Sequence, residues 1–569
     1  MNKLCRNGFV FLLACLAAAL PAHAIDYTWT GLSTTDFNMS GNWDPEGVPN
    51  SNDDTALIQD GLSNLGTSNT VSTLTLGAGS TSGTINLNSG GNLTASQVIQ
   101  SGTGTGTVNF NGGTITASAA STDFLSGTAN HIYSGGATID TQIYSVTIST
   151  VLNDPIAIPG GLTKLGAGTL SLSAANTYAG PTVISAGVLQ ADDGVGLPAG
   201  SLLRLDGGVL QTTAYTFTRN IGTLAGNVQW TANGGGFSAG SAGGLQVTLN
   251  GGATLVWGTD IQGTLKLNTP TSAGSVTITN NIDLGDTDRT IEVDYPSTSK
   301  NSGNFSGTIS GTGGIIKNGP GRLMMYMNKC LYTGTTTLND GFFANYAAVD
   351  PITKLSYQST GKYVVNGGTM CFCGLSPDSI AGLKITGGEV EGLGASILYS
   401  KTDYDIQGGE LYGITLANGP STVVGLTKTG ASVATLECTC TYTGTTFISE
   451  GTLALNTTSD GSYTGQISTS SLIENNATFL IADTNAHTIG TITGTGTTQL
   501  NDGAQLTASS MAQGTVTIGA GATLTIAAIA GGPTSGADLL SPVPEPNALV
   551  LLATAGLGVL LAAVCRKKR

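Results

Sequence analysis

The chain has 569 residues, of which 84 are Gly and only 10 % are charged, and its formal net charge is −15. An acidic chain repels phosphate, which excludes nucleic acid as a partner. A hydrophobic content of 40 % is enough for a packed core, and abundant Thr, Val and Ile beside few helix-forming residues predict an all-β fold.

The chain begins with the features of a secretion signal. Lys3 and Arg6 form a short basic start, and an apolar run covers residues 9–20. An A-x-A cleavage site follows at Ala22 and Ala24. We therefore expect the segment 1–24 to be a signal peptide that directs the chain to a secretion translocon.

Residues 25–60 are predicted to cap the fold that follows. They contain Trp29 and Trp43, half of the four Trp residues in the chain. Large aromatic side chains suit the covering of an open end of a β-structure. The alternative is a sugar-binding site, in which Trp stacks on a pyranose ring and Asp53 or Asp54 accepts hydroxyl hydrogens.

From residue 61 to 531 short apolar alternations are separated by Gly-rich turns, which predicts strands and not helices. Recurring Gly-Gly turns mark a period: the intervals between Gly91, Gly113 and Gly136 are 22 and 23, and turns from Gly368 to Gly409 repeat at 20 and 21. The longer gaps between such turns, 72, 44 and 116 residues, are close to whole multiples of this period. We predict an elongated right-handed parallel β-helix with coils of about 20–24 residues. The alternative is an antiparallel β-sandwich array with Gly-rich hairpins.

Three segments of this body, residues 162–191, 315–344 and 426–456, share one pattern. In each, a Lys precedes a Tyr-x-Gly by 14 or 15 residues, and a second Gly follows the Tyr-x-Gly glycine by 7. The equivalent residues are Lys164, Lys317 and Lys428, then Tyr178, Tyr332 and Tyr442, then Gly187, Gly341 and Gly451. The segments resemble the autotransporter-associated β-strand repeat, or passenger-associated transport repeat, of bacterial surface proteins. The resemblance implies a parallel β-helix at the cell surface and no chemistry.

Five cysteines lie in the body: Cys330 and two Cys-x-Cys sites, Cys371 with Cys373 and Cys438 with Cys440. The Cα atoms of residues i and i+2 in an extended strand are near or beyond the disulfide limit. We therefore predict buried free thiols. A four-thiolate metal site would require the two Cys-x-Cys strands to be adjacent, and their 67-residue separation argues against it.

Few residues are candidates for catalysis. His131 and His487 are isolated and lack metal-ligand spacing. The acid groups are Asp53–Asp54, Asp192–Asp193 and the looser set Asp283, Asp286 and Asp288, beside which Arg289 is the one adjacent base. Asp-rich turns are common in all-β chains, so we predict a non-catalytic protein without cofactor or metal. A β-helical polysaccharide lyase or glycosidase, which needs paired carboxylates, is the alternative.

The C-terminal tail has three parts. Residues 532–547 form a linker, residues 548–564 an apolar run just long enough to span a bilayer as a transmembrane helix, and residues 565–569 a basic cytoplasmic end. The defining residues are Pro544, Glu545 and Pro546 in the linker and Arg566, Lys567, Lys568 and Arg569 at the end. The tail resembles the PEP-CTERM sorting signal, which implies a membrane-embedded exosortase as partner and cleavage near the Pro-Glu-Pro. The alternative is an ordinary membrane anchor.

These features together predict an exported structural or adhesive protein of the cell surface or extracellular matrix. We expect it to pass through a PEP-CTERM/exosortase-type pathway and to work within extracellular polysaccharide.

Overall fold

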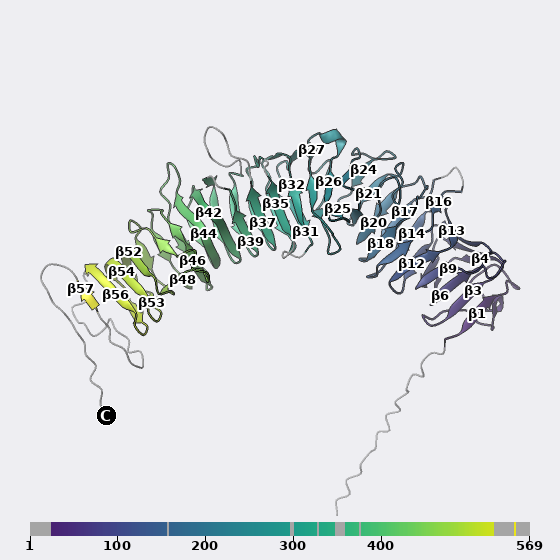
Figure 1. Cartoon of the computed structure of the whole chain (residues 1–569), viewed down its shortest axis with the longest axis horizontal. Helices are drawn as coiled ribbons and strands as arrows, with labels where there is room; N and C mark the ends of the chain where they lie inside the picture. The colour runs from purple at the N-terminus through teal and green to yellow at the C-terminus, as the bar shows by residue number, and fades with distance from the viewer. Residues whose placement is uncertain are drawn as a thin grey trace, which may run out of the picture. The chain divides into compact units, whose positions relative to one another are not determined.

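The computed structural model describes residues 24–155, 159–295, 301–326, 329–346, 359–374, 377–528 and 551–553. The described residues form strands and turns (Figure 1). The chain divides into two compact units, one ending at Gly160 and one beginning at Gly161. Each unit is a parallel β-solenoid, and the chain makes about 20 turns in all. Among the described residues the paired strands are parallel, except for β1 with β2. The prediction of an all-β parallel solenoid is confirmed, and the antiparallel sandwich is wrong.

The first unit has three sides, and each turn contributes one strand to each side. The first sheet contains β1 (Asp26–Trp29), β2 (Trp43–Asp44), β3 (Thr55–Ile58), β6 (Thr73–Leu76), β9 (Gln97–Gln100), β12 (Ser121–Ser126) and β15 (Val146–Ile148). The second contains β4 (Gly61–Leu65), β7 (Gly83–Asn88), β10 (Gly106–Asn111), β13 (Thr128–Ile132) and β16 (Leu152–Asn153). The third contains β5 (Ser68–Thr70), β8 (Asn92–Ala95), β11 (Thr114–Ala117) and β14 (Ala137–Asp140), and a 3-10 turn, η1 (Ser40–Asn42), lies before β2.

The turns of the first unit have a nearly constant length. Gly61 pairs with Gly83, Gly83 with Gly106, and Gly106 with Thr128, so the residue number rises by 22, 23 and 22 from turn to turn. This confirms the predicted coil length for the unit. Residues one turn apart stack about 4.8 Å from each other, so identical alternation in every strand builds continuous apolar columns. One such fully buried column consists of Leu65, Leu87, Phe110 and Ile132.

The second unit is a stack with two long sheets. One contains β18 (Thr169–Leu172), β20 (Val188–Gln190), β22 (Val209–Thr212), β25 (Gly235–Ala239), β28 (Leu265–Leu267), β31 (Arg289–Val293), β34 (Ile315–Asn318), β36 (Thr336–Leu338), β38 (Lys362–Val365), β41 (Gly382–Ile385), β43 (Tyr404–Ile406), β45 (Leu426–Lys428), β47 (Thr446–Ile448), β50 (Ile473–Asn475), β52 (Ala486–Thr493), β54 (Gln505–Ala512), β56 (Thr523–Ala528) and β57 (Leu551–Ala553). The other contains β23 (Thr216–Phe217), β26 (Leu245–Val247), β29 (Val276–Ile278), β32 (Ser302–Phe305), β35 (Arg322–Tyr326), β37 (Phe342–Tyr346), β39 (Thr369–Phe372), β40 (Asp378–Ile380), β42 (Glu389–Ser400), β44 (Gly409–Asn418), β46 (Val433–Cys440), β48 (Thr452–Leu455), β49 (Gln466–Ile467), β51 (Thr478–Ile481), β53 (Thr497–Leu500) and β55 (Thr515–Ile518).

Two smaller sets of strands complete the sides of the second unit. The first turns contribute β17 (Leu162–Leu165), β19 (Thr182–Ile184), β21 (Leu203–Leu205) and β24 (Val228–Trp230). The middle turns contribute β27 (Leu255–Val256), β30 (Ile282–Asp283) and β33 (Ile309–Ser310), with a 3-10 turn, η2 (Asn250–Gly252), before β27.

Turn length varies in the second unit. Val209 pairs with Gly236 and Gly236 with Lys266, so the residue number rises by 27 and then by 30 from one turn to the next. From Glu389 to its partner Glu410 it rises by only 21. The predicted coil length is therefore wrong in the stretch from residue 209 to 266. Its longer connections, including η2, lengthen the chain without adding a coil, so the Gly-Gly gaps there do not count turns.

The predicted signal peptide, apart from the exposed Ala24, and the sorting-signal residues from Pro544 to Arg569 lie outside the described residues, and both stay predictions. Of the predicted span 548–564, the structure describes three residues, which form β57 and pair in parallel with β56. In the described part of the chain, no helix has the length and apolar character needed to cross a bilayer.

Candidate functional site

Each of the three repeats buries its Lys completely in the core of the solenoid. Lys164 ends inside a corner, where its Nζ donates to the carbonyl oxygens of Leu165, Gly166 and Ala186 at 2.9, 2.8 and 3.2 Å. Lys317 and Lys428 repeat this arrangement, each with three carbonyl contacts between 2.6 and 3.1 Å. An ammonium group has three donors, so one carbonyl for each donor satisfies the buried charge.

The Lys contacts join two successive turns. Two of the three carbonyls belong to the corner directly after the Lys, and the third lies in the next turn, 22 residues on in the case of Lys164. Burial lowers the pKa of Lys317 from 10.5 to about 8, against the opposing effect of Asp340 and Glu292. Burial also lowers the pKa of Lys428. The lysines therefore have a structural role: their hydrogen bonds link successive coils.

The Tyr and the closing Gly of the repeat complete this corner. Tyr178 is fully buried and its hydroxyl lies 2.7 Å from Thr182 Oγ1. Gly187 has φ 60°, and a Cβ there would lie 2.5 Å from the Gly166 carbonyl, which Lys164 binds. Glycine is therefore required by both conformation and space. The same Tyr–Thr contact and closing glycine recur in the second and third repeats. We call the Lys, the Tyr and the closing Gly the repeat corner.

The outer faces carry ladders of amide and hydroxyl side chains. In the first unit Asn86 donates to Asn64 and Asn109 donates to Asn86, both at 2.8 Å between Nδ2 and Oδ1. A second ladder with the same 2.8 Å spacing, in the second unit, consists of Asn318, Asn339 and Asn366. Because each amide binds the equivalent amide one turn away, the ladders reinforce the register while leaving polar groups at the surface.

The aromatic residues near the N-terminus pack on one another. The Trp43 ring lies edge-on against Trp29 and Phe37, with centroids 5.0 and 4.8 Å apart, and its Nε1 donates to the Phe37 carbonyl at 2.7 Å. Trp29 and Trp43 are 6 % and 3 % exposed, so sugar stacking on these rings is excluded. Asp54 accepts hydrogen bonds from the backbone N–H groups of Ile25 and Asn50.

The pair Asp192–Asp193 also stabilises turns. Asp192 accepts bonds from Thr212 and Thr213; burial acts to raise its pKa, but these bonds lower it below the usual range. Asp193 forms a two-bond ion pair with the buried Arg219, at 2.5 and 3.1 Å. This acid–base pair joins residues 26 positions apart, which the sequence did not indicate.

Asp288 and Arg289, the adjacent acid and base, each bind the backbone of turns. Arg289 donates to the carbonyls of Leu284 and Trp257, both at 2.8 Å, and Asp288 accepts the Gly314 N–H at 2.7 Å. Asp283 likewise accepts the Gly285 N–H. These groups support turns.

The two histidines of the described residues lie in different units. His131 Nδ1 is 2.7 Å from Asn153 Oδ1 on the outer face of the first unit. His487 is buried, and its Nε2 lies 2.7 Å from Asp483 Oδ1. Each histidine is bound to a neighbour in its own unit.

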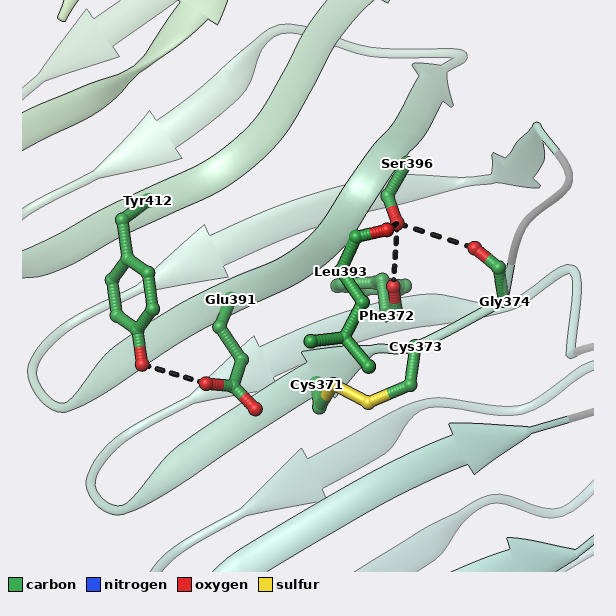
Figure 2. Close-up of a disulfide and its surroundings, with 8 residues drawn as sticks. All are labelled: Cys371, Phe372, Cys373, Gly374, Glu391, Leu393, Ser396 and Tyr412. Carbon is green, nitrogen blue, oxygen red and sulfur yellow. Dashed lines mark hydrogen bonds between the residues drawn. A yellow bond between two sulfur atoms is a disulfide. The ribbon is translucent and has the colours of Figure 1, made fainter. Parts of the chain in front are cut away.

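A column of chemically active side chains runs along the face of the long sheet opposite the main core, on β39, β42, β44 and β46. Its first member, Cys371, is fully buried in a small cluster with Ala344 and Cys373. Cys371 is in register with Glu391, Glu391 with Tyr412, and Tyr412 with Glu437. The Tyr412 hydroxyl donates to Glu391 Oε2 at 2.7 Å (Figure 2). Burial, followed by the bond to Glu391, raises the pKa of Tyr412, and burial also raises the pKa of Glu437. We call these four residues the outer column.

Cys371 and Cys373 form a disulfide with a Cα–Cα distance of 5.2 Å, so the prediction of free thiols is wrong for this pair. Residues i and i+2 of a straight strand are about 6.7 Å apart, but β39 ends at Phe372 and the shorter distance falls within the disulfide range. The prediction is confirmed for Cys330, Cys438 and Cys440, which are buried thiols that form no disulfide.

The sequence spacing alone could have located the first three residues of the outer column. The residue number rises by 20 from Cys371 to Glu391 and by 21 from Glu391 to Tyr412, the same intervals as the local Gly-Gly turns. The role of the repeat Lys was also missed, since a charged side chain in a strand normally faces solvent.

Comparison with known proteins places the repeat corner in a recognised context. The family profile of the passenger-associated transport repeat matches residues 162–191 and 426–455. The segment 315–344 has the same Lys, Tyr and Gly contacts. The chain therefore carries passenger-associated transport repeats.

The chain is also similar to a curated protein, the Adhesin BmaC autotransporter of Brucella suis biovar 1 (strain 1330), with 26 % identity over 259 residues. The aligned region covers 42 % of this chain but only 6 % of that protein, so the chain spans a small part of the relative's length. No solved structure matches the chain.

Proposed function

We propose that the protein is an exported, passenger-like solenoid that acts at the cell surface as an adhesive or structural protein and does not catalyse a reaction. The repeat corner carries this proposal, because it occurs at three places in a stack of parallel coils and coincides with the passenger repeat. The similarity to an autotransporter adhesin supports the adhesive role.

The outer faces support contact with extracellular polysaccharide. Amide ladders such as Asn64–Asn86–Asn109 present hydrogen-bonding groups at intervals of about 4.8 Å along the stack. Many weak polar contacts in a row give avidity without a deep pocket. A surface with few cations and a net negative charge suits a hydrated, uncharged or weakly charged glycan better than a phosphate-rich ligand.

For sorting, we propose that the translocon recognises the N-terminal signal and that an exosortase-like membrane enzyme processes the tail at Pro544, Glu545 and Pro546. Each Pro disfavours helix at the residue before it and so presents an extended segment to the enzyme. Replacement of all three residues by Ala should retain a longer, membrane-bound protein, as judged by the mature C-terminus in mass spectrometry. A wild-type protein that still ends at Arg569 in the envelope would instead support an anchor.

Surface exposure and adhesion are tested with a deletion strain. An antibody raised against residues 24–155 should label intact wild-type cells and not the deletion strain. Attachment to polysaccharide-coated surfaces should fall several-fold on deletion and return with the full-length gene. Antibody access only after permeabilisation, or unchanged attachment, would contradict the proposal.

A polysaccharide-active enzyme is the second candidate. It is favoured by Glu389 and Glu410, which are in register on adjacent strands β42 and β44 and so bring two carboxylates together. The purified full chain should release no reducing ends from anionic glycans if the adhesive proposal holds. Release that disappears in Glu410→Gln would support the enzyme instead.

A further inference from the structure

The Cys371–Cys373 disulfide lies beside a carboxylate. The two sulfur atoms and a carboxylate oxygen of Glu391 all lie within 4.8 Å of one another. The disulfide closes a loop of only three residues, and a loop this short removes little entropy from the unfolded chain. Its contribution to folding stability is therefore small, and its position suggests a chemical role.

We propose that Cys371, Cys373 and Glu391 form a redox-controlled zinc site. In the oxidised protein the two sulfurs are bonded to each other and cannot bind a metal. In the reduced protein they provide two thiolates, which together with the Glu391 carboxylate bind Zn²⁺ and leave a fourth position for water or an external ligand. Thiolate and carboxylate ligands in a tetrahedral set are typical of zinc.

The surroundings hold these three ligands in place. Ser396 is buried, and its Oγ lies 2.9 Å from the Phe372 carbonyl oxygen and 3.2 Å from the Gly374 carbonyl oxygen, on both sides of Cys373, so that these acceptors share its single hydroxyl proton. Tyr412 binds Glu391 Oε2, and Figure 2 shows the other carboxylate oxygen on the side of the disulfide. A partner that fixes a ligand in this way strengthens metal binding.

The required movement is small. Two thiolates on one zinc, each about 2.3 Å from the metal, are about 3.8 Å apart in tetrahedral geometry. Cys371 and Cys373 reach this separation by side-chain rotation after the S–S bond breaks, because their Cα atoms, 5.2 Å apart, already allow it. The backbone bonds of Ser396 can remain in place.

The redox step is balanced by a thiol or phosphine reductant. A dithiol transfers two electrons and two protons to the disulfide and becomes a disulfide itself. A phosphine with one water gives the phosphine oxide and the same two protein thiols. Zinc binding then releases the two thiol protons, so binding strengthens as pH rises.

The second Cys-x-Cys site is an internal control. Cys438 and Cys440 are free thiols in the oxidised protein, and they are buried, as Cys371 and Cys373 are. Zinc bound at these residues would appear without any reduction. Zinc bound at Cys371 and Cys373 appears only after reduction.

The experiment uses the full chain, with and without phosphine reduction, under anaerobic conditions. Bound zinc is measured by elemental analysis after desalting, and Co²⁺ is used as a spectroscopic probe for thiolate-to-metal charge transfer. We expect one zinc per reduced chain, none per oxidised chain, and a circular dichroism spectrum unchanged by reduction. Zinc should also slow the return of the disulfide in glutathione disulfide.

Variants identify the ligands. Glu391→Gln should weaken zinc binding by more than tenfold, and Tyr412→Phe by about 10-fold. Glu389→Gln, on the same strand and face, is the matched control and should bind as wild type. The proposal would be overturned if the oxidised chain or the reduced Glu391→Gln variant bound zinc as tightly as the reduced wild type. A reduced wild-type chain that binds no zinc would overturn it as well.

Discussion

Both units of the molecule form parallel solenoids, but they differ in the charged residues that they contain. Residues 24–155 of the first unit contain 10 acidic residues and neither Lys nor Arg. The described part of the second unit contains both charges and buries three lysines in its core. The first unit nevertheless forms a regular solenoid whose turns are nearly constant in length. The buried Lys is therefore not needed for coiling.

This difference shows what the repeat corner adds. In the first unit apolar columns and amide ladders define the register. In the second unit, where turns differ in length, an ammonium group ties selected turns to their neighbours. A specific polar contact in the core fixes register where the apolar pattern alone is less uniform.

The largest expected effect is the loss of a buried ammonium. Lys428→Met should destabilise the second unit by about 3–9 kcal/mol, because three buried carbonyls lose their donor at about 1–3 kcal/mol each. Denaturant unfolding monitored by hydrogen exchange should show the loss in the second unit and none in the first. Lys384→Met is the control: its 3.7 Å contact with Asp405 is partly exposed, and its removal should cost less than about 1 kcal/mol. Equal losses would mean that the repeat corner is not a special contact.

Next is the closing glycine. Gly451→Ala should cost about 2–4 kcal/mol, because φ is 67° and a Cβ would lie 2.4 Å from the Gly430 carbonyl. Gly461→Ala has a similar φ of 74° but no atom within 4 Å, so it should cost only about 1–2 kcal/mol. The difference between their denaturation midpoints measures the clash alone. If the two midpoints are equal, the repeat corner adjusts to the added methyl group without cost.

Alkaline pH should affect the second unit through Cys330. Burial raises the pKa of this thiol from 9.0 to about 12. The unfolded thiol loses its proton near pH 9 and the folded one near pH 12, so its stabilising contribution is complete below pH 9 and declines above it, by up to about 1.4 kcal/mol per pH unit. In Cys330→Ala this part of the decline should be absent, while buried groups such as Tyr363 and Cys438, whose pKa values are also raised, keep their own part.

Lys317 contributes the opposite slope. Its folded pKa of about 8 lies below 10.5, so the unfolded chain holds more protons between these values and stability rises with pH. The free energy of unfolding of wild type and of Cys330→Ala is measured by denaturation from pH 8 to 11. The contribution of Lys317 is the same in both proteins, so it cancels in their difference. A difference that does not shrink with pH would show that the folded thiol titrates normally.

The smallest effect is expected in the outer ladder of the first unit. Asn86→Ala should cost about 1 kcal/mol, because it breaks the bonds to Asn64 and Asn109. Thr84→Ala, on the same strand and face, should cost less than about 0.5 kcal/mol. Hydrogen exchange in β7 distinguishes the two. Equal protection in both variants would mean that the ladder does not fix register.

The sequence predicted those parts of the fold that depend on local repetition. Gly-Gly turns such as Gly91 and Gly113 indicated the coil of the first unit, and the Lys-Tyr-Gly pattern indicated the repeats. Turn length between residues 209 and 266 could not be predicted, because connections there vary without changing the strands. The Asp193–Arg219 pair and the outer column depend on which residues meet one or more turns apart. Predicting either contact requires the strand register, which can be derived from the sequence only where the coil period is regular.

The absence of Lys and Arg from residues 7–163 has a practical consequence for finding this protein on cells. Between Arg6 and Lys164 trypsin has no bond to cleave, so the unit stays within a single peptide that ends at Lys164, even when it is unfolded. Amine-reactive surface labels find no lysine in that stretch, and the buried Lys164, Lys317 and Lys428 are shielded from them. Tryptic shaving and amine biotinylation would therefore under-report this stretch, although the exposed Lys362 and Lys401 of the second unit remain accessible to them. Proteases that cleave at acidic or aromatic residues, or carboxyl-directed labels, are the suitable reagents.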